Sequence, residues 1–298
     1  MAEPTVLAEP VWQARRDLHA RRMRAWTVPH QQRRVRGEKH PVLDFLFTYY
    51  SHRPAQLERW HPGPGVVLAG ESAREYLRWP AYTETPDGVT VDVAALPESR
   101  RRSARFIRDL LSATASRAPR LGCFGLHEWA MVYRQPATQV RHVDWPLRLG
   151  AAGTDAVVET QTIKCSHFDA FRFFTEPARP LNTLDPSRDK QIALEQPGCL
   201  HATMDLFKWA YKLDPYTPSD LLADCFDLAS DVRELDMRAS PYDLSDLGYE
   251  PVMIETERGR ADYVRAQAEF TRRAKPLRAN LIALCDDLLS DFTDRQPY

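Results

Sequence analysis

The stretch from Cys165 to Leu213 constrains this chain most, because it combines side chains that neither a plain core nor a plain surface would need. It opens in CSHFDAFRFF and closes in QPGCLHATMDLFKWAYKL, with a polar connector between them. His and Asp residues are interspersed there with Phe, Trp and Tyr, although ionisable side chains are rarely buried in a purely apolar core. We therefore expect this stretch to form the wall of a pocket.

The periodicity of apolar residues predicts a mainly α, or α+β, fold: a helical protein with a small antiparallel β-hairpin. A hairpin is expected where two strand-like segments, 140–150 and 155–164, are joined by a Gly-containing loop. A further short strand is expected over 89–93, after the Asp87-Gly88 turn. Helices are expected over about 10–24, 99–116, 201–213, 219–236 and 259–292, with Pro276 kinking or breaking the last. No repeat or sharp boundary divides the chain, so one helical domain over 1–298 is expected.

The formal net charge of -1 hides a strong asymmetry along the chain. Residues 1–36 carry eight Arg and three acidic residues, whereas residues 220–250 carry nine acidic residues and two Arg. We expect a basic N-terminal helix and linker over 1–40, interrupted at Pro29. Its charge predicts that it faces the acidic segment or meets an anionic partner. A second Arg cluster lies over 100–108.

The five cysteines are widely spaced and form no CxxC motif, which favours a reducing compartment over a disulfide framework. No apolar run approaches the roughly 18–20 residues that cross a bilayer. The N-terminus lacks the pattern of a signal peptide. A soluble, cytoplasmic protein without membrane contact is therefore expected. P-loop, dinucleotide, GxSxG and HExxH motifs are missing from the sequence, which disfavours the enzyme classes that depend on them.

His127 and Glu128 lie inside an almost wholly apolar run, GCFGLHEWAMVYRQP. An ionised Glu in such a place is costly unless it is paired. The pattern predicts a buried partner, which could be a His, a metal ion or simply an Arg.

His167 and Asp169 form an HxD pair that we expect at the end of a strand, where residues i and i+2 point to one face. Such a pair supplies two of the three ligands of a facial iron triad. The helical character of the following chain argues against the barrel that such oxygenases use.

His201 and Asp205 lie at i and i+4, so they are neighbours on one helix face. They could bind a metal or orient a catalytic group. Because Lys208 and Lys212 continue the same stripe, a solvated polar face explains the pattern equally well.

Asp236 shares a helix face with Cys225, Ala229 and Val232, so its carboxylate needs a partner there. Arg238 or Arg172 could serve. The other acids of 220–234 lie opposite the apolar face of an amphipathic helix, toward solvent or the basic N-terminus.

Five long strings of the chain are KHPVLDFLFTYYSHRPAQLERWHPG, GLHEWAMVYR, KCSHFDAFRFFT, EQPGCLHATMDLFKWAYKL and RELDMRASPYDL. Together they resemble a family found mainly in actinobacteria and commonly labelled 3-methyladenine DNA glycosylase. The resemblance extends from about Trp12 to Leu277. The chain lacks the helix–hairpin–helix signature of well-studied helical glycosylases.

The resemblance implies excision of an alkylated purine from DNA, with no cofactor. A flipped cationic base would lie between aromatic rings, beside a carboxylate that stabilises the sugar cation. Asp169 would be that carboxylate, with Glu128 or Asp205 as alternatives and His167 and His201 as its orienters. The Arg clusters 15–36 and 100–108 would contact phosphates. Substrate contacts would come from Trp129, Phe168, Trp209 and Arg172.

Two other functions remain open from the residues alone. One is a non-heme metal enzyme, with one or two iron ions or another divalent metal in a helical bundle, acting on a small molecule. The usual ExxH spacing of such bundles is missing. Its candidate ligands are His127, Glu128, His167, Asp169 and His201. The other is a protein that binds a small molecule without catalysis.

Overall fold

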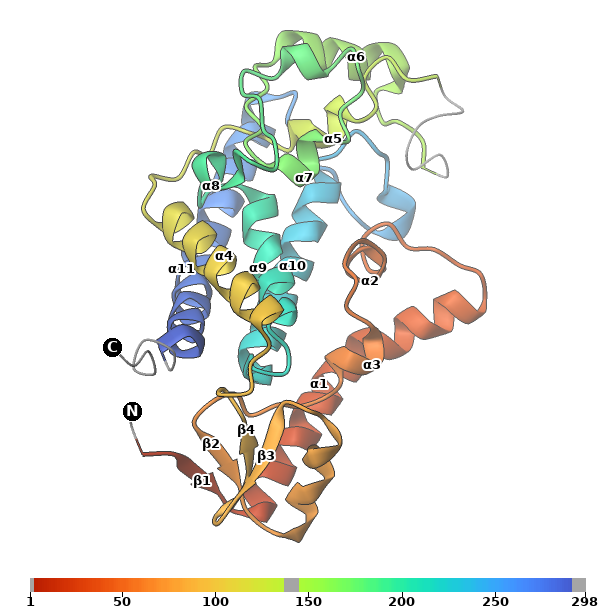
Figure 1. The fold of residues 1–298 in the computed structure, drawn as a ribbon. Helices are drawn as coiled ribbons and strands as arrows, with labels where there is room; N and C mark the ends of the chain where they lie inside the picture. Colours follow the sequence, from red (N-terminus) through yellow and green to blue (C-terminus); the bar gives the residue numbers. More distant parts are fainter. Residues whose placement is uncertain (1–2, 137–144, 291–298) are drawn as a thin grey trace, which may run out of the picture. The chain divides into compact units, whose positions relative to one another are not determined.

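The computed structural model of the chain describes residues 3–136 and 145–290. The fold is mainly helical with one small β-sheet, as the sequence predicts (Figure 1). The longer helices are α1 (Glu9–Val35), α4 (Glu98–Ala115), α6 (Gly150–Thr160), α9 (Leu200–Lys212), α10 (Ser219–Arg238) and α11 (Glu257–Ser290). The shorter ones are α2 (Phe45–Tyr49), α3 (Pro54–Leu57), η1 (Glu71–Arg78), α5 (Leu126–Ala130), α7 (Phe168–Phe171), η3 (Arg179–Leu181), α8 (Gln191–Leu194) and η4 (Ser245–Leu247).

The sheet has four strands in the order β1-β2-β4-β3. They are β1 (Thr5–Leu7), β2 (Val66–Leu68), β3 (Tyr82–Thr85) and β4 (Gly88–Val91). β1 pairs with β2 in parallel, and the other pairs are antiparallel. β4 confirms the strand expected after the Asp87-Gly88 turn, because Val89 and Val91 alternate into the core while Thr90 is only half-buried.

The hairpin expected over 140–164 is wrong, because Gly150–Thr160 form helix α6. The buried residues of this segment are Thr154, Val157 and Val158, which follow the i, i+3, i+4 spacing of a helix face. Residues 140–144 of the expected first strand lie outside the described residues. The antiparallel hairpin of this fold is instead β3–β4.

The chain divides into two compact units. Unit 1 comprises Met1–Asp109, Leu206–Asp227 and Leu277–Tyr298, and unit 2 comprises Leu110–Asp205 and Leu228–Pro276. Unit 1 holds the sheet and α1, and unit 2 holds the short helices α5, α7 and α8. The single domain expected from the sequence stays a prediction.

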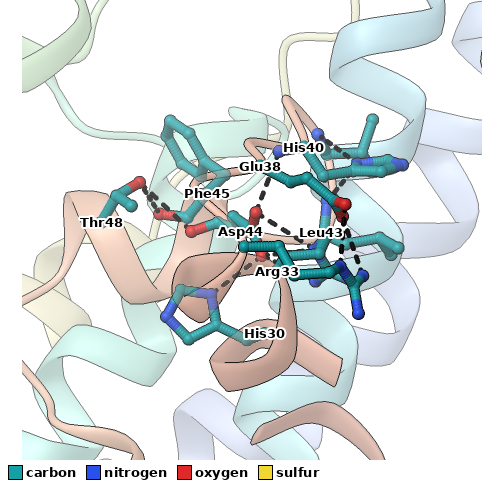
Figure 2. A network of polar contacts seen from close by, with 10 residues as sticks. His30, Arg33, Glu38, His40, Leu43, Asp44, Phe45 and Thr48 are labelled. Carbon is teal, nitrogen blue, oxygen red and sulfur yellow. Dashed lines mark hydrogen bonds and ion pairs between the residues drawn. The ribbon is translucent and has the colours of Figure 1, made fainter. Parts of the chain in front are cut away.

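Helix α1 continues to Val35, although Pro29 was expected to interrupt it. A proline inside a helix costs about 3 kcal/mol, so contacts beyond it must offset that cost. Figure 2 shows them: His30 Nδ1 lies 2.8 Å from Asp44 Oδ1, and Arg33 Nη2 donates to the same oxygen at 2.6 Å. The backbone N–H of His40 donates to the other Asp44 oxygen at 2.9 Å. This network, termed the Asp44 network, holds the end of α1 and the following turn together.

The basic N-terminal helix meets part of the acidic segment, as one of the two sequence interpretations predicts. Arg22 Nη2 lies 2.7 Å from Asp224 Oδ1 and 2.5 Å from Asp227 Oδ2. Trp26 donates its indole N–H to Asp227 at 3.1 Å. All of these contacts lie within unit 1.

Helix α11 is unbroken at Pro276, so the sequence predicted its extent but not its continuity. Among the described residues, no helix combines the length and the apolar character that crossing a membrane would need.

Candidate metal centre

Eight ionisable side chains, termed the buried cluster, converge in unit 2 from five separate segments. None of them is more than 6% exposed to solvent. They come from α5, from the residue before α7, from the residue after α8, and from α9 and α10. They are His127, Glu128, His167, Glu195, His201, Asp205, Arg233 and Asp236.

Six members of the buried cluster form three pairs that are close together in the sequence. A left-handed Gly125 (φ +68°) precedes α5 and turns His127 and Glu128 into the interior. On α9, His201 and Asp205 are one turn apart, and on α10, Arg233 and Asp236 are i, i+3 neighbours.

The centre of the buried cluster is a contact between His127 and Asp236. His127 Nε2 lies 2.8 Å from Asp236 Oδ1. Arg233 Nη1 donates to the other Asp236 oxygen at 3.1 Å and to Glu128 Oε1 at 3.0 Å. The Glu128–Arg233–Asp236 chain therefore fixes the orientation of the Asp236 carboxylate.

His167 lies beside a second pair of carboxylates. Its Nε2 atom is 3.3 Å from Asp205 Oδ2 and 3.5 Å from Glu195 Oε1. The centroid of the His201 ring lies 4.4 Å from that of His127 and 5.3 Å from that of His167. His201 therefore contacts both of the other imidazoles.

The imidazoles of His127 and His201 have opposite protonation tendencies. Burial disfavours the charged form of His127, but the Asp236 carboxylate outweighs burial and raises the pKa of His127. Burial, together with nearby His127, lowers the pKa of His201 well below its ordinary value. His201 is therefore neutral at pH 7 and carries a nitrogen lone pair suited to a metal ion.

The buried cluster contains more carboxylates than permanent cations. Glu128, Glu195, Asp205 and Asp236 are acidic, and Arg233 is the one Arg or Lys among the eight residues. Buried charge is costly unless it is paired, and the imidazoles of His127 and His167 lie against three of these carboxylates, Asp236, Glu195 and Asp205.

The geometry of three of these groups suits a metal ion. One ring nitrogen each of His127 and His201 and one oxygen of Asp236 lie within 4.8 Å of one another. Ligand bonds of about 2.0–2.2 Å would place such atoms about 3–3.5 Å apart, so the 2.8 Å contact between His127 and Asp236 would open slightly when a metal binds. Two imidazoles with one carboxylate are the protein ligands of several zinc hydrolases and of non-heme Fe(II) enzymes.

A narrow cavity lies against two of these ligands. It has a volume of about 20 Å³ and is lined by His127, His201 and three cysteines, Cys123, Cys165 and Cys199. That volume holds about one water molecule. A neighbouring cavity of about 80 Å³ shares Cys123, Lys164, Ser166 and Gln196 with it.

The cysteines give this cavity a neutral wall. Burial raises the pKa of Cys165 to about 12 and raises that of Cys199 well above its ordinary value. Gln267 Nε2 donates to Cys123 Sγ at 3.3 Å, and Tyr263 Oη lies 3.8 Å from the same sulfur. The thiols are therefore protonated and add no charge to the buried cluster.

The structure brings together six of the residues singled out in the sequence. They are His127, Glu128, His167, His201, Asp205 and Asp236. The solvated stripe considered for α9 is wrong at His201 and Asp205, which are buried, although Lys212 at the end of the helix is exposed.

Asp169 has a different environment. It lies in the first turn of α7 and not at the end of a strand, so the expected strand geometry of the HxD pair is wrong. Asp169 Oδ1 pairs with Nε of the exposed Arg172 at 3.3 Å. Phe168, beside it, is half-buried.

Neither Trp129 nor Trp209 stacks on a member of the buried cluster in the contacts of the described residues. Trp129 is fully buried and donates its indole N–H to the Ala239 carbonyl at 2.9 Å. Trp209 belongs to unit 1, where its ring lies 5.8 Å from Phe106.

Three members of the buried cluster were missed or incompletely described by sequence reasoning. Asp236 was expected to need a partner, but the partners are His127 and Arg233, and Arg238 instead pairs with Glu234 at 3.3 Å. The i, i+3 spacing of Arg233 and Asp236 could have indicated that pair. Glu195 follows a four-residue helix and carries no sequence signal of its burial.

The Arg cluster over 100–108 is largely occupied within unit 1. Arg101 donates to the carbonyls of Leu96 and Ala94 at 3.0 and 3.2 Å, and Arg100 bonds the Lys212 carbonyl. Arg105 pairs with Glu98, and Arg108 with Asp109. Four of the five arginines of this cluster therefore have partners within unit 1.

Comparison of the chain with protein-family models, with curated proteins and with solved structures finds no match. The geometry of the buried cluster therefore carries the functional argument by itself.

Proposed function

We propose that this protein is a non-heme metal enzyme that acts on a small molecule, with His127, His201 and Asp236 holding one divalent metal ion such as iron. The observation that carries the proposal is the convergence of their three ligand atoms within 4.8 Å. The four carboxylates of the buried cluster support it, because their negative charge favours a divalent cation.

The residues around the proposed ligands have definable roles. Arg233 holds Oδ2 of Asp236 and so leaves Oδ1 for the metal. The proton now shared by His127 and Asp236 would leave when a metal binds. His167, between Asp205 and Glu195, is placed to accept or return a proton near the His201 ligand.

The size of the cavity beside His127 and His201 is consistent with a reactant as small as water. With room for about one water molecule, it would supply a metal-bound water or an equally small co-substrate and exclude bulk solvent. The base excision implied by the family resemblance needs space for a purine between rings and stays a prediction.

The experiment is the metal content of the purified full chain, compared between two matched variants. Asp236→Asn removes a proposed ligand charge, and Asp169→Asn makes the same change in an ion pair with an exposed Arg. The wild type and Asp169→Asn should hold about one metal ion per chain, whereas Asp236→Asn should hold far less.

A second ligand variant protects the test against misfolding. His201→Ala should also lose the metal, and it should lose the visible absorption of protein loaded with Co(II), while circular dichroism shows retained helix. A wild-type chain that binds no metal after exposure to Fe(II), Zn(II) and Co(II) would overturn the proposal.

A further inference from the structure

A separate cavity in unit 1 is lined by an unusual number of arginines. It has a volume of about 370 Å³, within the range of small-molecule sites. Its walls come from α1, from the residues after α3, and from η1 with the residue that follows it. The residues that carry the argument are Arg16, Arg21, Arg24, Arg59, Arg78 and Trp79.

Two of the five arginines have carboxylate partners. Arg16 Nη1 lies 2.8 Å from Glu75 Oε1, and Arg24 Nε lies 3.2 Å from Glu58 Oε2. These pairs hold α1 to the two neighbouring walls of the cavity. In each pair the carboxylate also neutralises the arginine, so Arg16 and Arg24 add little to the positive potential in the cavity.

The other three arginines leave the cavity with positive charge. Within residues 3–136 and 145–290, Arg21, Arg59 and Arg78 have no carboxylate at ion-pair distance. Asp17, the remaining acid of the wall, lies 3.2 Å from Arg16. Three guanidinium groups around one hollow match the three terminal oxygens of a phosphate monoester.

An aromatic ring fixes two of these guanidinium groups. The Arg78 guanidinium lies 4.2 Å from the centroid of Trp79, and that of Arg59 lies 5.9 Å from it. Trp79 is itself held by Tyr76 and His61, with ring centroids 5.2 and 5.3 Å away. Trp79 therefore pre-organises the Arg78 guanidinium and, at longer range, that of Arg59, which lowers the entropy cost of binding an anion.

We propose that this cavity binds a small phosphorylated molecule, with its phosphate on Arg21, Arg59 and Arg78 and a planar group beside Trp79. The proposal is independent of the metal centre in unit 2. A compact site fits the contacts better than an extended nucleic-acid surface, because other arginines of α1, such as Arg22 and Arg33, are engaged by Asp224, Asp227 and Asp44. Binding to duplex DNA would need phosphate contacts over a longer surface.

The test is calorimetric titration of the full chain with adenosine monophosphate, adenosine, inorganic phosphate and a duplex oligonucleotide. Adenosine monophosphate should bind saturably, inorganic phosphate more weakly, and adenosine not measurably. The double variant Arg59→Ala, Arg78→Ala should weaken nucleotide binding by more than about tenfold, because charge-assisted hydrogen bonds are lost.

The matched control is Arg36→Ala, an exposed arginine on the same unit that pairs with Glu38. It should bind the nucleotide like the wild type. Circular dichroism should show that neither variant loses helix. Equal affinity of the double variant and the wild type, no saturable binding of either phosphate probe, or binding of the duplex alone would each overturn the proposal.

Discussion

His127 Nε2 and Asp236 Oδ1 lie 2.8 Å apart, in side chains that are 5% and 0% exposed. They are more than a hundred positions apart in the chain, on α5 and α10. A buried histidine–carboxylate contact at this distance is a hydrogen bond, and the two atoms would have to move slightly apart to hold a metal ion together. Four experiments test this arrangement and the contacts that stabilise the fold.

Replacing Arg233 by Met should lower the free energy of unfolding by about 3–5 kcal/mol, because Glu128 and Asp236 would lose their buried cation. The measurement is urea denaturation at pH 7. Arg238→Met is the matched control on the same helix, because the side chains of Arg238 and Glu234 are 36% and 48% exposed and their pair should contribute less than about 1 kcal/mol. Equal losses in the two variants would contradict a structural role for the buried pair.

Asp169→Asn separates the two enzymatic proposals. If Asp169 stabilises a sugar cation, as the family resemblance implies, the variant should abolish release of methylated base from alkylated duplex DNA while the fold stays intact. If the metal centre is the active site, Asp169→Asn should keep its metal, because the Asp169 carboxylate pairs with the exposed Arg172. The measurements are base release and metal content on one preparation. Full base release by Asp169→Asn would remove this residue from the excision mechanism.

His52 should make the protein less stable as the pH falls. Burial lowers the pKa of His52 to about 4, whereas an unfolded histidine titrates near 6.5. The unfolded chain therefore binds this proton first, and the free energy of unfolding should fall by up to about 3 kcal/mol between pH 6.5 and 4. His52→Phe should remove that part of the slope, because Phe can keep the stacking on Tyr211 at 5.0 Å. Parallel pH profiles of wild type and variant would refute the assignment.

Asp44→Ala should destabilise the end of α1. Asp44 accepts hydrogen bonds from Arg33, His30 and the His40 backbone, so their loss should cost about 2–4 kcal/mol in thermal or urea unfolding (Figure 2). Glu38→Ala is the control, because its pair with Arg36 is exposed and should contribute less than about 1 kcal/mol. Hydrogen exchange should localise the change to residues near Pro29. A uniform change over the whole chain would argue against a local effect.

Local pattern determined most of the helices. Residues 98–115, 200–212, 219–238 and 257–290 are helical where apolar residues recur at helical spacing. The same reasoning failed over 150–160, because adjacent apolar residues such as Val157 and Val158 fit a strand as well as a helix face. It also failed at Pro29, where the end of the helix is held by contacts with Asp44, which lies beyond the helix.

For the candidate site, the sequence by itself determined which residue types needed partners. An acid in an apolar run, Glu128, and a carboxylate on an apolar helix face, Asp236, both required compensation. Only the tertiary structure decided that one arginine, Arg233, compensates both, and that His201 faces inward while Lys212 on the same stripe is exposed. The physical reason is that burial cost depends on a residue's own chemistry, whereas the compensating group comes from wherever packing brings another segment into contact.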